Sequence, residues 1–186
     1  MQYPPSVSHG ADFAADNLHT DGGLTYRWYQ NKWGKPLYAF GHGLSFSQFT
    51  YEWAAQPQAS VSIASLKSKA GKGCYDCSAL AFSVKVINTG QVAGDAVVLG
   101  FVVVKGALVG RALFDFGRVS LAAGASSVVV LRMDASCKQA ISRVDQTGAR
   151  FVEQGEYTIT AGDIVAPVTH ELMVTGESQG IDPHCR

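Results

Sequence analysis

The carboxylates of this sequence come first, because two facing carboxyl groups are enough for acid–base or nucleophilic catalysis. Glu153 and Glu156 flank a glycine, whereas Asp95, Asp115 and Asp163 stand beside glycines or at the ends of apolar runs. Acids in such places usually belong to solvated turns. No spacing predicts that two of them face each other, so we expect none to be catalytic.

The histidines are scattered, and a lone histidine supplies neither a metal-ligand set nor a base–nucleophile pair. They are His9, His19, His42, His170 and His184. His42 lies between two glycines and is expected to be a packed or hydrogen-bonded structural residue. The sequence also lacks the G-x-S-x-G, H-E-x-x-H and phosphate-loop motifs. We therefore predict no catalytic residue, no metal site and no cofactor in this chain.

The four cysteines are Cys74, Cys77, Cys137 and Cys185. The run "CYDC" could be half of a zinc site or a redox motif, but no nearby Cys/His pair completes a zinc site. No βαβ pattern surrounds it, as a redox motif would need. A structural disulfide in an oxidising compartment is the favoured interpretation, although no N-x-S/T sequon supports secretion.

The elements around these residues are predicted to be strands. "SALAFSVKVIN" alternates, with Leu80, Phe82, Val84 and Val86 on one face, and the turn residues "NTG" follow from the end of that run. "AVVLGFVVVK" is apolar on both faces, which is typical of a central strand covered on both sides. Further predicted strands are "ASVSIASL" (59–66), "SSVVVLRM", "GEYTITAG" and "THELMVTG". One short helix could begin at Ser136.

Composition and strand spacing together predict the fold class. The 186 residues are 47% hydrophobic and 16% charged, which favours a globular chain. Seven or so short strands with regular turns predict an all-β fold, an immunoglobulin or fibronectin type III-like β-sandwich with an irregular N-terminal arm. We expect an arm and linker at 1–44, the sandwich at 45–176 and a C-terminal tail at 177–186.

Charge and hydropathy exclude several classes of partner. Fifteen basic and fifteen acidic residues leave a formal net charge of zero, which argues against nucleic acid and anionic membranes. The longest apolar run, 96–104, is too short to span a bilayer. The residues after Met1 have neither the basic start nor the apolar core of a signal peptide.

The segment "TYRWYQNKWGKPLYAFGHGLSF" is the unusual part of the chain, because it concentrates aromatic rings before the sandwich begins. Rings of this number need a surface to bury against. We interpret them as packing between domains. The alternative is a sugar-stacking platform made of Trp28, Tyr29 and Trp33.

This segment resembles the joint of glycoside hydrolase family 3 enzymes that leads into their C-terminal fibronectin type III-like domain. The matching residues are Thr25, Tyr26, Arg27, Trp28, Tyr29, Pro36, Leu37, Tyr38, Phe40, Gly41, His42, Gly43, Leu44, Ser45, Phe46 and Phe49. "VKVINTGQVAGDAVVLGFV" and "LFDFGRVSLAAGASSVVVLRM" also resemble family segments. "CKQAISRVDQTGARFVEQGEYTITAGD" is similar to the plant-type β-xylosidases and α-arabinofuranosidases.

The resemblance implies a secreted parent enzyme that removes terminal β-xylosyl, arabinosyl or β-glucosyl residues by a retaining mechanism. Its catalytic carboxylates would lie in a barrel and an α/β domain that this chain lacks, and those domains would be the partners. The chain itself is then a non-catalytic fragment. The joint residues implied are Tyr26, Trp28, Tyr29, Pro36, Tyr38, Phe40, Gly41, Gly43, Leu44 and Phe46, where Gly41 and Gly43 allow tight turns.

The plant-type resemblance also implies a disulfide between Cys77 and Cys137. Two other functions stay open. The chain could be a free-standing carbohydrate-binding module that uses Trp28 and Trp33, or an adhesion-type sandwich with a protein partner.

Overall fold

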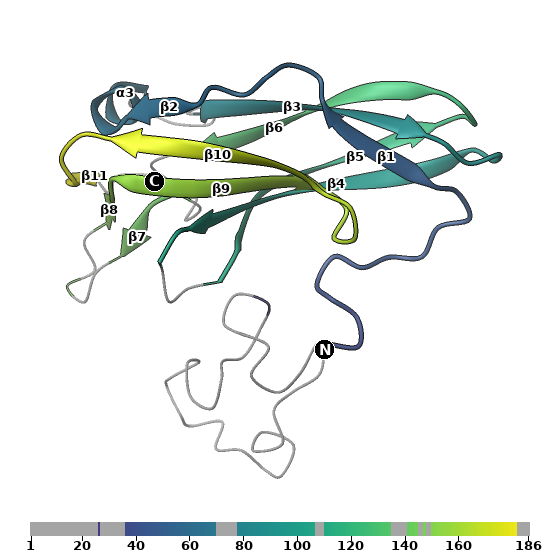
Figure 1. Cartoon of the computed structure of the whole chain (residues 1–186), viewed down its shortest axis with the longest axis horizontal. Coiled ribbons are helices and arrows are strands. Elements are labelled where there is room, and N and C mark those ends of the chain that lie inside the picture. The colour runs from purple at the N-terminus through teal and green to yellow at the C-terminus, as the bar shows by residue number, and fades with distance from the viewer. Residues whose placement is uncertain are drawn as a thin grey trace, which may run out of the picture.

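The computed structural model describes residue 26 and residues 36–69, 78–106, 110–134, 141–144, 147 and 150–181. Two sheets form the layers of a β-sandwich, which confirms the predicted all-β class (Figure 1). One layer is a three-stranded sheet in the order β1 (Phe49–Trp53), β3 (Ser78–Asn88) and β6 (Ser126–Asp134).

The other layer is a five-stranded sheet with β4 and β9 inside it. Its order is β2 (Ser60–Ser62), β10 (Val168–Thr175), β9 (Gly155–Gly162), β4 (Gly94–Val104) and β5 (Ala112–Leu121). All pairings in both layers are antiparallel except that of β2 with β10. The predicted runs of β3, β4, β6, β9 and β10 therefore coincide with observed strands.

The core lies between the two layers, and alternation along β3 shows why. Phe82, Val84 and Val86 are at most 1% exposed, as the alternation predicted. Phe82 meets Phe114 of β5 with ring centroids 5.7 Å apart, so the two sheets contact each other directly. Burying this apolar surface is the main favourable term that holds the layers together.

The predicted strand at 59–66 is wrong in its second half, where the chain forms helix α3 (Ile63–Lys69). The backbone N–H of Ser65 donates to the hydroxyl of Ser62 at 3.1 Å, which gives the helix an N-cap. Ile63 and Leu66 are three residues apart and both are buried. That spacing fits one face of a helix, and it stops the strand after Ser62.

A small third sheet lies at one end of the sandwich, in the order β11 (Gln179–Ile181), β8 (Arg150–Val152) and β7 (Arg143–Val144). The region expected to be a C-terminal tail thus includes a paired strand, β11. The predicted helix from Ser136 begins outside the described residues, and β7 occupies two of its later positions. No helix in the described part of the chain is long and apolar enough to cross a membrane.

Candidate interdomain surface

The arm is defined here as residues 36–48, which lead into β1. It runs along the side of the five-stranded sheet that faces away from β3 and β6 (Figure 1). Two sets of contacts anchor it, one at its end beside β1 and one near its middle.

A buried amide, Asn88 at the end of β3, makes the first anchor. Asn88 is completely buried, and its side-chain N–H groups donate to the carbonyls of Val92 and Leu121 at 2.9 and 3.1 Å. Its side-chain oxygen accepts from the hydroxyl of Ser47 at 2.6 Å and from the backbone N–H of Gly90 at 3.0 Å. The amide is therefore fully used, and it ties the arm to the turn between β3 and β4 and to the end of β5.

The next two residues of the same turn lie directly against the arm. The backbone N–H of Thr89 donates to the carbonyl of Gln48 at 2.8 Å. A Cβ at Gly90 would lie 2.1 Å from Oγ of Ser47 and 2.9 Å from the backbone nitrogen of Gln48. Gly90 is not among the described glycines with positive φ, so its φ does not require a glycine. It is required instead because the arm approaches its backbone closely.

A cluster of rings makes the second anchor. Phe40 stacks on Tyr26 with centroids 4.1 Å apart, and both rings meet Phe101 of β4 edge-on at 6.2 and 6.1 Å. The guanidinium carbon of Arg111 lies 4.7 Å from the centroid of Phe101, and its Nη2 donates to the carbonyl of Phe40 at 3.5 Å. Phe101 is consequently only 3% exposed, although it lies outside the cluster of core residues.

The glycines of the arm differ from each other. Gly41 has a φ of 91°, and a Cβ there would lie 2.4 Å from Cδ1 of Leu99 in β4. Its backbone therefore rests directly on the sheet, as expected of a position where a side chain does not fit. Gly43 has no atom within 4 Å of such a Cβ, so nothing in the described chain restricts a side chain there.

Between and before the anchors, the arm exposes large apolar side chains. They are Leu37, Tyr38, Leu44 and Phe46, of which Leu44 and Phe46 are 96% and 103% exposed. His42 is also exposed and stacks on Tyr38 with centroids 5.1 Å apart. Apolar groups held out from a fixed backbone in one short segment are typical of a binding surface.

The carboxylates considered as catalytic candidates all have structural partners. Glu153 pairs with Arg143, Glu156 with Lys105, and Asp95 with Arg118. Asp115 accepts backbone N–H groups of Phe116 and Arg132, and Asp163 accepts those of Val165 and Ala166. No group of three or more His, Cys, Asp or Glu side chains able to hold a metal ion occurs among the described residues.

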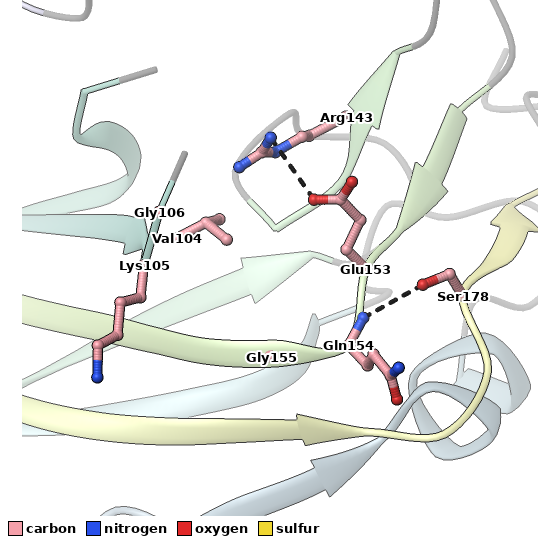
Figure 2. Close-up of a pocket in the computed structure, with 8 residues that line it drawn as sticks. All are labelled: Val104, Lys105, Gly106, Arg143, Glu153, Gln154, Gly155 and Ser178. Carbon is pink, nitrogen blue, oxygen red and sulfur yellow. Dashed lines mark hydrogen bonds and ion pairs between the residues drawn. The ribbon is translucent and has the colours of Figure 1, made fainter. Parts of the chain in front are cut away.

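A polar hollow of about 380 Å³ lies where β4 and β9 approach the small sheet (Figure 2). The ion pair of Arg143 and Glu153, with its N and O atoms 3.5 Å apart, lines one side. The backbone N–H of Gln154 donates to the hydroxyl of Ser178 at 3.4 Å on another side, and Lys105 projects away from the ion pair. The described residues that line the hollow offer hydrogen-bonding groups but no aromatic platform.

Several predicted site residues lie outside the described residues. These are Trp28, Tyr29, Trp33, Cys77 and Cys137. Arg111, Phe101 and Asn88 were not among the predicted site residues, because each lies far from the arm in the sequence. One sequence signal pointed to Phe101: the strand β4 is apolar on both faces, which predicted that both of its faces are covered.

Several known proteins share sequence with this chain. No model of a protein family matches the sequence. Beta-D-xylosidase 1 of Arabidopsis thaliana is 32% identical over 162 residues, which cover 76% of this chain and 20% of that protein. Thermostable beta-glucosidase B of Acetivibrio thermocellus is 30% identical over 171 residues, which cover 86% of this chain and 20% of that protein.

A solved structure shares the fold. It is the GH3 exo-beta-xylosidase XlnD in complex with a xylobiose aziridine probe, with a TM-score of 0.82 at 24% identity. The likeness covers 97% of this chain and 24% of that chain. This chain is homologous to part of the glycoside hydrolase family 3 enzymes. This family 3 homologue spans about a fifth of the length of the curated relatives it matches. The rest of each relative lies outside the matched segment and is long enough to form further domains.

Proposed function

We propose that this chain is the non-catalytic, C-terminal fibronectin type III-like module of a secreted family 3 glycosidase, and that the module braces the catalytic domains. The observation that carries the proposal is the arm, which is anchored on the sandwich while Leu44 and Phe46 stay almost fully exposed. A neighbouring domain that covers these side chains would account for both features.

The strand order supports the fibronectin type III-like assignment. A sheet of β1, β3 and β6 faces a larger sheet in which β4 lies between β5 and β9, and β10 follows β9. The two sheets enclose one apolar core, as in other sandwiches of this class.

The parent reaction is proposed from the relatives, whose printed names are xylosidases and glucosidases. Retaining hydrolysis of a glycosidic bond needs two carboxyl groups about 5 Å apart, one as nucleophile and one as acid/base. In this chain Glu153 and Glu156, the nearest pair in sequence among the candidates, are each engaged by a different cation. Both carboxyl groups of the parent are therefore assigned to its other domains, of barrel and α/β type.

A chimera tests the brace. The homologous fifth of Arabidopsis Beta-D-xylosidase 1 is replaced by this chain, and hydrolysis of 4-nitrophenyl β-xyloside is measured for the chimera, for the enzyme without that fifth, and for this chain alone. We expect the chimera to be active and more heat-stable than the truncated enzyme, and this chain alone to be inactive. Hydrolysis by this chain alone would refute the non-catalytic role.

Substitutions in the arm sharpen the test. Leu44→Ser with Phe46→Ser is expected to lower the unfolding temperature of the chimera and to leave that of the isolated chain unchanged. Val165→Ser is the matched control, because Val165 is exposed on the hairpin between β9 and β10. Equal effects of the arm pair and the control would contradict docking through the arm. Binding of xylo-oligosaccharides by the isolated chain would instead favour a carbohydrate-binding module.

A further inference from the structure

The outer face of β4 is apolar, although a strand exposed on one side normally alternates with polar residues there. Ala96 and Val98 point into the core and are buried. Val97 and Leu99 point to the opposite side, because successive side chains of a strand alternate. The arm covers Leu99 at Gly41, whereas Val97 remains 44% exposed.

Strand β5 continues this apolar face. Leu99 pairs with Phe116 and Val97 pairs with Arg118, so Phe116 and Arg118 lie on the same outer face. Gly117, between them, points the other way, since a Cβ there would lie 2.5 Å from Cγ1 of Val129. The ring of Phe116 is 64% exposed. Leu99 therefore connects the arm to an uncovered pair, Val97 and Phe116.

A charged border closes one side of this face. Nε of Arg118 donates to Oδ2 of Asp95 at 3.0 Å, and the hydroxyl of Ser120 donates to the other carboxylate oxygen. The Ser120 hydroxyl and the Arg118 guanidinium lower the pKa of Asp95, which keeps this carboxylate charged. An apolar centre with a polar rim is the usual composition of a protein–protein interface.

We propose that the docking surface of the arm extends onto the outer face of β4 and β5, where Val97 and Phe116 contact the domain that precedes this module in the parent enzyme. This inference rests on the proposed function. The preceding domain is the occupant because the arm connects the sandwich to it and already lies on this face. The curated relatives are about five times longer than their matched segment, so they have chain to supply that contact.

Cysteine labelling of the chimera tests the proposal with a control matched in residue type and exposure. Val97 and Val130 are both 44% exposed, and Val130 of β6 lies on the opposite sheet. Val97→Cys and Val130→Cys are labelled with a maleimide, and modification of each peptide is followed by mass spectrometry. In the isolated chain both should label at similar rates. In the chimera the labelling of Val97→Cys should slow by about tenfold or more, with Val130→Cys unchanged.

A third variant separates this inference from the proposed function. Leu44→Cys reports on the arm. If it is protected in the chimera while Val97→Cys labels as fast as in the isolated chain, the extension onto β4 and β5 is wrong and the brace stands. If neither is protected, both fail. Adding Phe116→Ser to Val97→Cys should restore part of the lost labelling rate.

Maleimide labelling can also be applied if the chimera does not fold or if the isolated chain associates with itself. A chimera that does not fold is replaced by the truncated enzyme with this chain added in trans, where the same protection is expected. Protection of Val97→Cys that grows with the concentration of the isolated chain would show that a second copy occupies the face. That result would overturn the proposal.

Discussion

At the scale of single residues, Asn88 is the side chain whose removal we expect to destabilise the chain most. It is completely buried and makes four side-chain hydrogen bonds, one of which holds Ser47 of the arm. Asn88→Ala should destabilise the chain by about 2–3 kcal/mol, because the carbonyl of Leu121 and the N–H of Gly90 lose their side-chain partner in a buried place. Urea unfolding measures this loss. Thr89→Ala, at the exposed neighbouring position, is the control and should cost under about 1 kcal/mol. Equal losses would contradict the role of Asn88.

Two tyrosines, the buried Tyr157 and the half-buried Tyr51, predict how stability depends on alkaline pH. Burial raises the pKa of Tyr157 to about 12, and its hydroxyl donates to the carbonyl of Glu153 at 2.7 Å. Burial likewise raises the pKa of Tyr51 to about 12. An unfolded tyrosine ionises near pH 10, so the unfolded chain binds fewer protons above that pH. Stability should therefore be full below about pH 10 and fall as pH rises towards 12.

Tyr157→Phe tests this linkage. The free energy of unfolding at pH 8 and at pH 11 is measured for both proteins. The variant should be less stable at pH 8 because it lacks the hydrogen bond, but it should lose less stability between the two pH values. An unchanged pH dependence would argue against an ionisation that is coupled to folding at Tyr157.

At the scale of elements, Asp115 joins the two sheets at one open edge of the sandwich. Its carboxylate accepts the backbone N–H of Phe116 in β5 at 2.9 Å and that of Arg132 in β6 at 2.7 Å. Strand β6 is at the edge of its sheet in the described part of the chain, and Asp115 supplies this N–H with an acceptor from the other sheet. Asp115→Ala should destabilise the chain by about 1–2 kcal/mol in urea unfolding. Asp95→Ala, on the surface of the five-stranded sheet, should have little effect.

The pairing of β3 with β6 also bears on the predicted Cys77–Cys137 bridge. Ser78 pairs with Asp134, so the chain segments that carry the two cysteines leave the same end of one sheet. Cys77 directly precedes Ser78, and Cys137 lies three positions after Asp134, a span of at most about 11 Å. Peptide mapping without reduction should recover the two cysteines linked. Recovery of both as free thiols would count against the bridge, which stays a prediction.

At the scale of the whole molecule, the arm has one face on the sandwich and one in solvent. Leu44→Ser with Phe46→Ser should leave the unfolding free energy of the isolated chain within about 0.5 kcal/mol, because both side chains are already exposed. Binding of an apolar fluorescent dye should fall. Phe40→Ser should raise it, since loss of the stack with Tyr26 uncovers Phe101. If the double variant bound more dye and Phe40→Ser bound less, the assignment of Leu44 and Phe46 to the solvent face and of Phe40 to the sandwich face would be wrong.

Much of this fold could be predicted from local pattern. The alternation of Leu80 to Val86 placed β3 and its buried face, because side chains of a strand alternate whatever the strand packs against. Helix α3 could not be predicted from "ASVSIASL", since β-branched and small residues fit a strand equally well. The Ser62 cap and the burial of Ile63 and Leu66 selected the helix.

The sequence by itself determined β3, β4, β6, β9 and β10, the sandwich class and the presence of an aromatic arm, because these depend on periodicity and composition within short windows. Only the tertiary structure decided which arm residues belong to which surface. Phe40 lies against Phe101 of β4 and Ser47 bonds to Asn88 of β3, whereas Leu44 and Phe46 face solvent. Contacts between residues 41 to 61 positions apart have no local signature, since they exist only after the chain has brought distant strands together.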